Sequence, residues 1–160
     1  MKLAIREIHR SELAFLKEIL YQAIFVPEGQ SPLPKNIIEH PDLVKYIENF
    51  GRDGDLCLVA ELDDELVGAA WARLYSEQNK GYGFIDYQTP ELNMAVLEGY
   101  RNIGIGSKLL TGIFKGLKNK GYRKVSLSVD KSNYALNLYL KFGFEIFTST
   151  ETSVTMIKPF

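Results

Sequence analysis

Residues 91–106 read ELNMAVLEGYRNIGIG, and this stretch decides how the second half of the chain is interpreted. Its first seven residues, Glu91 to Leu97, are mostly apolar and predict a strand. A glycine-bearing loop follows from Gly99 to Gly106, and Ser107 to Asn119 predicts a helix. Lys124 to Val129 then alternates apolar and polar side chains, as a strand does. Together these segments predict a β-loop-α-β unit of about the length that a parallel crossover needs.

The loop before the predicted helix is suited to an anionic ligand. Gly104 and Gly106 allow backbone conformations that direct several N–H groups at one spot. The helix that follows adds free N–H donors and a favourable dipole, so phosphate oxygens are the natural occupant. Two glycines before a helix also occur as plain turn residues, and that alternative stays open at this point.

Two common phosphate-binding motifs fit this loop poorly. A nucleotide P-loop needs Gly-Lys-Ser or Gly-Lys-Thr, whereas Gly106-Ser107-Lys108 has the lysine in the wrong position. A dinucleotide fingerprint needs a third glycine where Leu109 stands, and Asp130 meets only its demand for a later acidic residue. The sequence therefore disfavours an NTPase and leaves a dinucleotide-binding, Rossmann-like protein as the less favoured alternative.

The rest of the chain predicts further helices and strands. Their mixed order indicates an α/β or α+β fold with one mixed sheet, in a single domain spanning residues 1–160. Gly68 indicates a β-bulge or a close backbone approach, and Gly143 suits the end of a helix. The other predicted elements are a strand Leu3–Glu7, a helix with Ser11 as its N-cap, a loop over Val26–Pro34, a helix from Pro41 to Phe50, a hairpin of Leu56–Leu62 and Leu66–Leu74 with a turn at Asp63-Asp64-Glu65, a short strand Gly83–Tyr87, a helix Tyr134–Lys141, and strands Phe144–Thr148 and Ser153–Ile157.

The composition is that of an ordinary enzyme-sized protein. Because Cys57 is the one cysteine, no intrachain disulfide can form and a secreted scaffold is disfavoured. No window approaches ~18 consecutive apolar residues, and the charged N-terminus lacks the apolar region of a signal peptide. We therefore expect a cytoplasmic protein that does not bind a membrane.

The charge is unevenly distributed along the chain. Residues 101–129 hold seven basic side chains and no acidic one, although the whole chain has 19 basic and 20 acidic residues. A locally basic region on an acidic remainder favours an anionic ligand at one place rather than a nucleic-acid surface. A solvated basic helix face is the alternative interpretation.

The loop and a second group of residues resemble the GNAT superfamily of N-acetyltransferases. The central motif of that family is Arg/Gln-x-x-Gly-x-Gly/Ala between a strand and a helix, and Arg101–Gly106 matches it. A second GNAT-like motif follows at the expected distance, as Asn133-Tyr134-Ala135, then Leu138-Tyr139, then Phe142-Gly143-Phe144. The resemblance covers Leu92 to Phe147, about a third of the chain.

This resemblance implies a GNAT-like mixed, twisted central β-sheet flanked by helices. The central parallel strands that end at Leu97 and Val129 are expected to splay apart, with the thioester arm of acetyl-CoA in the gap. Lysines on the helix could meet the 3′-phosphate. The residues that the resemblance assigns to acetyl-CoA are Ala95, Val96, Leu97, Arg101, Asn102, Ile103, Gly104, Ile105, Gly106, Ser107 and Asn133.

The reaction implied is transfer of the acetyl group to a primary amine of a small molecule or peptide by direct attack on the thioester. The resulting oxyanion needs an N–H donor, which the backbone near Ala95 or Val96 could supply, worth roughly 3 kcal/mol. The leaving thiolate needs a proton, and Tyr139 occupies the tyrosine position of the second motif as an exposed acid. Because Tyr139 also continues the apolar face of its helix, a purely structural ring is the alternative.

A base is also expected, because an alkylamine of pKa near ~10.4 costs roughly 4 to 5 kcal/mol to deprotonate at neutral pH. Glu91 begins the strand in which some family members carry a catalytic carboxylate, so it is the candidate base. Asp86 and Glu28 lie in loops on the acceptor side, and any of the three could instead be a surface charge. His9 and His40 lack the partner pattern of a triad or metal site, and no metal is expected.

The acceptor side is less well defined by the sequence. Tyr82 and Phe84 are expected to form a lid, and the Pro27 to Pro34 loop is expected to contribute to specificity. Two other classes stay open, namely an acyl-CoA-binding regulatory module without catalysis and a nucleic-acid-associated protein. The second is disfavoured because the chain has no recognisable nucleic-acid motif and a net charge of -1. The sequence does not fix the oligomeric state, and a homodimer is compatible with it.

Overall fold

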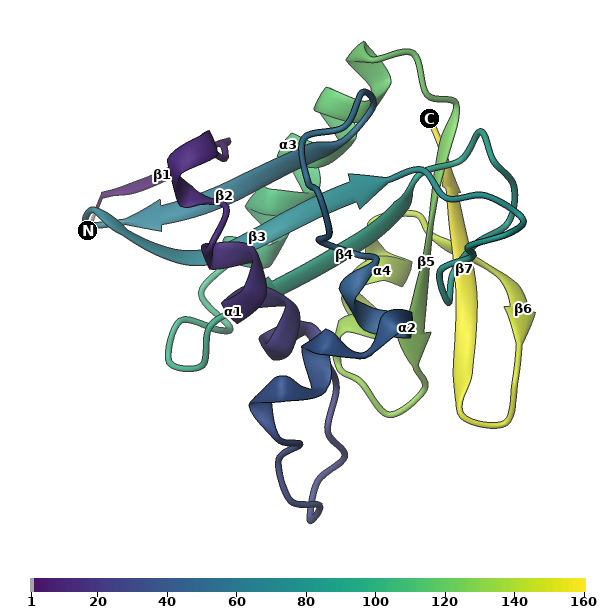
Figure 1. Ribbon diagram of the computed structural model, residues 1–160, viewed down its shortest axis with the longest axis horizontal. Coiled ribbons are helices and arrows are strands. Elements are labelled where there is room, and N and C mark those ends of the chain that lie inside the picture. Colours follow the sequence, from purple (N-terminus) through teal and green to yellow (C-terminus); the bar gives the residue numbers. More distant parts are fainter. Residues whose placement is uncertain (1) are drawn as a thin grey trace.

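The computed structural model describes residues 2–160 and has one mixed β-sheet at its centre. The strands are β1 Leu3–Glu7, β2 Leu56–Leu62, β3 Glu65–Arg73, β4 Glu91–Val96, β5 Lys124–Asp130, β6 Glu145–Ser149 and β7 Ser153–Pro159. They lie side by side in the order β1-β2-β3-β4-β5-β7-β6 (Figure 1). All neighbouring pairs are antiparallel except β4 and β5, which confirms the predicted mixed sheet.

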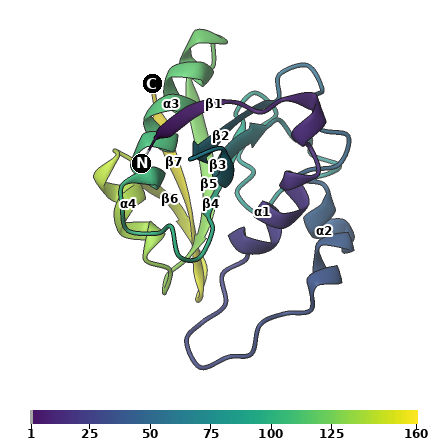
Figure 2. The same cartoon turned by 90° about the vertical axis from the view of Figure 1, so that its left-hand side faces the viewer.

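Helices cover both faces of the sheet. They are α1 Phe15–Ala23, α2 Pro41–Val44, α3 Ile105–Asn119 and α4 Ala135–Lys141. A view turned by 90° shows α3 and α4 on one face and α1 and α2 on the other (Figure 2). Within residues 2–160, none of the helices has the length and apolar character needed to span a membrane.

Apolar residues at helical spacing fix α3 against the sheet. The side chains of its inner face are at most 2% exposed, and full burial of each contributes roughly 1.5–3 kcal/mol. On the opposite face, α1 buries Leu16, Ile19 and Leu20 in a second cluster around Trp71. The inner face of α3 consists of Ile105, Leu109, Leu110, Ile113 and Leu117.

The sheet opens between its two parallel strands. Among the described residues, β4 and β5 share one register pair, Glu91 with Ser126, beside which the Ser126 amide donates to the Pro90 carbonyl at 3.0 Å. β5 pairs instead along its full length with β7. Beyond Glu91 the two strands diverge, which confirms the predicted splay.

The hairpin of β2 and β3 has the predicted turn. Asp63 and Asp64 both have positive φ, 50° and 69°, as a two-residue type I′ turn requires. The strand register shifts beside Gly68, so the predicted bulge is present. A Cβ atom at Gly68 would lie 3.2 Å from the Ala95 carbonyl oxygen, and the backbones of β3 and β4 therefore approach closely.

The predictions for the first two helices are partly wrong. Ser11 is not an N-cap, because a 3-10 helix over Arg10–Glu12 begins after His9 and α1 starts at Phe15. The helix expected from Pro41 to Phe50 ends at Val44, and turns follow it. The side chain of Arg73, rather than main-chain amides, takes the carbonyl groups of residues 45 and 49 in these turns.

Other differences are local. The expected strand Gly83–Tyr87 is absent from the described chain, where Asp86 instead caps a turn by accepting from the Gln88 amide and the Thr89 hydroxyl. The helix expected from Ser107 begins two residues earlier, at Ile105, because Gly104 is its N-cap. The remaining boundaries agree with the predicted ones to within one or two residues, a normal uncertainty for element ends.

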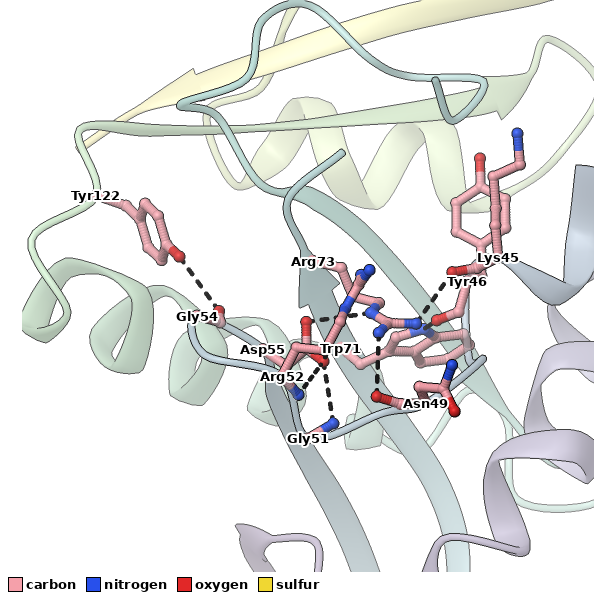
Figure 3. A network of polar contacts seen from close by, with 10 residues as sticks. All are labelled: Lys45, Tyr46, Asn49, Gly51, Arg52, Gly54, Asp55, Trp71, Arg73 and Tyr122. Carbon is pink, nitrogen blue, oxygen red and sulfur yellow. Dashed lines mark hydrogen bonds and ion pairs between the residues drawn. The ribbon is translucent and has the colours of Figure 1, made fainter. Parts of the chain in front are cut away.

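A buried ion pair attaches the segment after α2 to β3 (Figure 3). Arg73 Nε donates to Asp55 Oδ1 at 3.1 Å, and the two side chains are 1% and 3% exposed. Arg73 Nη1 donates to the Lys45 carbonyl at 3.0 Å, and Nη2 donates to the Asn49 carbonyl at 3.5 Å. Because both side chains are withdrawn from water, loss of Asp55 leaves the Arg73 charge buried without an acidic partner.

We predict that Asp55→Ala lowers the free energy of unfolding by about 3–5 kcal/mol, because it leaves the Arg73 charge buried and unpaired. Urea denaturation measures the loss. Asp53→Ala is the matched control, since Asp53 is exposed, and should change stability by less than about 0.5 kcal/mol. Equal effects of the two substitutions would show that the buried pair does not hold this segment.

Candidate active site

Two cavities, each of about 180 Å³, lie where β4 and β5 separate. We call them the α1 cavity and the α4 cavity after the helices that border them. Ala23, Asn93 and Ser128 line both, so the two cavities meet at the gap in the sheet. The α1 cavity is also lined by Leu20, Ile24, Leu43, Tyr46, Tyr82 and Glu91, and the α4 cavity by Phe25, Leu92, Met94, Val129, Asp130, Asn133, Ala135 and Tyr139.

Glu91 places a buried carboxyl group in the α1 cavity. The residue is 2% exposed, its Oε2 accepts a 2.8 Å hydrogen bond from the Tyr46 hydroxyl, and its Oε1 has no partner among the described residues. Burial raises the pKa of Glu91 from 4.5 to about 7, opposed by the Tyr46 hydroxyl, the Gly83 amide and the Lys45 charge. A carboxyl group with this pKa can accept or release a proton near neutral pH.

The alternative carboxylates lie elsewhere. Asp86 is engaged in its turn and lies 3.6 Å from Lys124 Nζ, and Glu28 is exposed. Neither residue lines either cavity. His9 and His40 are exposed, and residues 2–160 contain no group of three or more side chains suited to a metal ion. Of the three candidate bases, Glu91 is therefore the one that the fold brings to the gap.

The backbone of β4 directs alternate groups into the gap. The Leu97 amide donates to Val67 in β3 at 2.8 Å, and by the alternation of an antiparallel ladder Ala95 also faces β3. The N–H groups of Met94 and Val96 therefore face the β5 side. Of the two candidate oxyanion donors, Val96 is directed at the gap and Ala95 is not.

The loop of residues 101–106 presents the N-terminus of α3. Gly104 has a φ of 89° as the N-cap, and Asn102 is also left-handed with a φ of 63°, whereas Gly106 lies in the regular first turn of the helix. The conformational freedom expected of both glycines is therefore used by Gly104 alone. The Arg101 side chain turns back, with Nε donating to the Val96 carbonyl at 2.8 Å, so free N–H donors of residues 105–107 remain at the helix end.

The second motif lines the α4 cavity. Asn133 Oδ1 accepts from the Ala135 amide at 2.9 Å, which caps the start of α4. The Tyr139 ring is largely buried, because the residue is 6% exposed and its ring packs edge-on against Phe144, with the ring centroids 5.5 Å apart, but the residue also lines the α4 cavity. Burial raises the pKa of Tyr139, so its hydroxyl stays protonated at neutral pH. The ring belongs to the core and also borders the cavity, which combines both interpretations of this position.

The two residues expected to form a lid, Tyr82 and Phe84, lie in different environments. Tyr82 is 63% exposed and lines the α1 cavity, whereas Phe84 packs against the apolar cluster beneath α1. The loop of residues 27–34 lines neither cavity.

Sequence analysis missed three residues of the site. The sequence analysis singled out neither Tyr46, which lies within the helix expected from Pro41 to Phe50, nor Asn93 and Ser128. Asn93 carried a usable signal, because a polar residue two positions after Glu91 must point to the same face of an otherwise apolar strand. Tyr46 carried none, since its contact with Glu91 spans 45 positions of sequence.

The profile of the acetyltransferase (GNAT) family matches residues 17–144. The chain belongs to the GNAT acetyltransferase family. Its activity is acetyl-CoA-dependent N-acetylation, and the predicted GNAT fold and resemblance are confirmed.

Relatives of this GNAT acetyltransferase agree with that assignment. N-alpha-acetyltransferase 50 of Danio rerio is 31% identical over 122 residues, covering 72% of this chain and 69% of that protein. An N-alpha-acetyltransferase of Sulfolobus acidocaldarius is 33% identical over 126 residues with the same coverage. Two solved structures, each 21% identical, share the fold: PaiA N-acetyltransferase from Thermoplasma acidophilum, solved with coenzyme A (TM-score 0.71, all of both chains), and an N-acetyltransferase from Staphylococcus aureus (TM-score 0.72, 99% of both).

We predict that Glu91→Gln stabilises this acetyltransferase increasingly as pH rises. The folded carboxyl group has a pKa of about 7 against 4.5 ordinarily, so its burial carries no penalty below pH 4.5 and the full penalty above pH 7. Glutamine is neutral throughout, so the stability difference should grow across this window to about 3 kcal/mol. Chemical denaturation at pH 4, 6 and 8 measures it, with Glu48→Gln, at an exposed position, as the control. A constant difference for Glu91→Gln would show that Glu91 does not titrate there.

Proposed function

We propose that this GNAT acetyltransferase acetylates the α-amino group of a peptide or protein, with the acceptor in the α1 cavity and acetyl-CoA in the α4 cavity. The observation that carries the proposal is the buried carboxyl group of Glu91 in a cavity that meets the second cavity at the gap in the sheet. The N-alpha-acetyltransferase relatives support a peptide acceptor.

The pKa of Glu91 also favours an α-amino group over an alkylamine. A peptide α-ammonium group has a pKa of about 8, so its proton passes to a carboxylate of pKa about 7 at a cost of roughly 1.4 kcal/mol. An alkylammonium group of pKa about 10.4 would give up its proton to the same carboxylate at a cost of roughly 5 kcal/mol. A base of this strength is matched to the weaker of the two amines.

The donor would be held along the second cavity. Residues 101–107 would bind the pyrophosphate through free N–H groups at the start of α3, where the left-handed Gly104 begins the helix. The Asn133 side chain would meet the pantetheine arm through its amide NH₂, because its Oδ1 caps α4. The unpaired edge of β4 that includes Val96 would pair with the same arm, as a further strand would.

The reaction would proceed in the gap between the strands. The acceptor ammonium gives its proton to Glu91, directly or through water, and the neutral amine attacks the thioester carbonyl carbon. The Val96 N–H donates to the oxyanion that forms. As the C–S bond breaks, the thiolate takes the Tyr139 hydroxyl proton, and the nitrogen, which is cationic after the attack, releases its second proton to solvent. Solvent then removes the proton from Glu91 and returns one to Tyr139.

Thiol release from acetyl-CoA tests the acceptor class. We expect turnover with a lysine-free peptide that has a free N-terminus, and little with the same peptide N-acetylated and carrying one lysine, or with a simple alkylamine. Glu91→Gln should lower kcat for the first peptide by about 10²-fold. Preference for the lysine peptide or alkylamine would overturn the acceptor assignment. Tight coenzyme A binding without thiol release from any mixture would favour the acyl-CoA-binding module.

Tyr139→Phe tests the acid. Because only the hydroxyl is removed and the ring stays in the core, we expect kcat to fall by about 10–10²-fold while the Kd for acetyl-CoA changes little. Calorimetric titration and steady-state kinetics measure the two quantities. Tyr134→Phe, on a side chain 89% exposed, is the control and should retain turnover. Unchanged turnover in Tyr139→Phe would remove this hydroxyl from the mechanism.

A further inference from the structure

Tyr46 connects two parts of the α1 cavity through one hydroxyl group. The residue is buried in the turns that follow α2. Its hydroxyl accepts from the Tyr82 amide at 2.7 Å and donates to Glu91 Oε2 at 2.8 Å. Because a tyrosine hydroxyl has a single proton, that proton is committed to the carboxyl group.

The backbone around Tyr46 is held at several points (Figure 3). Trp71 Nε1 donates to the Tyr46 carbonyl at 3.0 Å. On either side, Arg73 binds the carbonyl groups of Lys45 and Asn49, and Arg73 itself is paired with Asp55. Tyr46 therefore projects from a turn that β3 side chains fix in place.

The loop of residues 80–82 packs against the Tyr46 hydroxyl and the Glu91 carboxyl group. A Cβ atom at Gly81 would overlap Glu91 Oε1 and lie 2.8 Å from the Tyr46 hydroxyl, so a larger residue would displace either the loop or these two side chains. The Lys45 ammonium group donates to the Lys80 carbonyl at 2.8 Å. Residues 80–82 are thus attached to the segment that carries Tyr46, and they cover the carboxyl group.

We propose that Tyr46 is a positioning residue: it orients the Glu91 carboxyl group for proton transfer and couples it to the loop of residues 80–82 over the α1 cavity. With Oε2 held by Tyr46, the partnerless Oε1 is the oxygen that takes the acceptor proton. Because Oε1 lies beneath Gly81, the loop must move, or a water must enter, before that oxygen receives a proton. This inference rests on the proposed role of Glu91 as the base.

Polar and charged groups from several elements face the Glu91 carboxyl group and influence its pKa. Lys45 and Tyr46 approach from the turn, the Gly83 amide from the loop, Tyr75 from beyond β3 and Ser126 from β5, while the neighbouring Arg73 is occupied by Asp55. Among these, the Tyr46 hydroxyl is the strongest influence that favours the carboxylate. Its removal would raise the pKa of Glu91 further, because burial would then act against fewer donors.

The experiment compares two buried tyrosines. Tyr46→Phe should move the acidic limb of the kcat/KM profile for the free-N-terminus peptide upward by about one pH unit and lower kcat at pH 7 by about 10-fold. Tyr75→Phe is the matched control, because the Tyr75 ring packs against Tyr46 at 5.5 Å but its hydroxyl has no partner among the described residues. It should leave the limb unmoved. An unshifted limb in Tyr46→Phe, or an equal shift in both, would overturn the proposal.

Two further variants keep the outcomes separate. If Glu91→Gln keeps the wild-type profile, Glu91 is not the base and the proposed mechanism itself fails. If Glu91→Gln loses the acidic limb while Tyr46→Phe keeps it, only the positioning role fails. Should Tyr46→Phe not fold, Gly81→Ala decides, because its methyl group forces the loop away from Tyr46 and Glu91. We expect a downward shift of the limb, because water then reaches the carboxyl group, and a higher KM for the peptide. An unmoved limb would overturn the proposal.

Discussion

The site depends on a single register pair between two parallel strands. Glu91 and Ser126 hold β4 and β5 together at one end, and beyond them the sheet opens. Four buried side-chain polar atoms lack a partner in the described chain, and three of them belong to these two strands, on Glu91, Asn93 and Ser126. Each such atom costs about 1–3 kcal/mol. The cost of these unpaired atoms is therefore concentrated on the two strands that separate.

Packing on both sides of the sheet makes this opening tolerable. The apolar face of α3 covers β2 and β3 on one side, and α1 closes the other around Trp71, so neither layer depends on the lost pairing between β4 and β5. β5 is secured by its antiparallel partner β7 over seven register pairs. The divergence is therefore stable because each strand is fully engaged on its outer edge, and the gap is left free for a ligand.

Local patterns in the sequence predicted most of the fold, whereas long-range contacts decided the site. Gly104, the apolar repeat of α3 and the Asn133 to Phe144 motif act within a few residues of one another, so their spacing was informative. The end of α2 at Val44 could not be predicted from local spacing. The carbonyl groups of Lys45 and Asn49 accept hydrogen bonds from Arg73, which lies on a later strand. The same holds for Tyr46, whose hydroxyl meets a strand that the sequence places far downstream. The family resemblance named Glu91 as a candidate base from its position at the start of a strand, but its burial and the upward shift of its pKa depend on the turn that carries Tyr46 and on the loop of residues 80–82.

Glu91 is the residue of β4 that is in register with β5, and this position reconciles two opposing demands. The base that we propose must be held in a fixed orientation, and the Glu91 backbone is paired with Arg73 of β3 on one side and Ser126 of β5 on the other. A substrate channel needs open space, and two residues further on Asn93 already lines both cavities. A carboxyl group further along β4, in the gap, would stand on a part of the strand that is not paired with β5. A carboxyl group before Glu91 would lie farther from the place where the two cavities meet. The boundary between paired and unpaired strand is thus the place where a rigid carboxyl group and an accessible thioester can coexist.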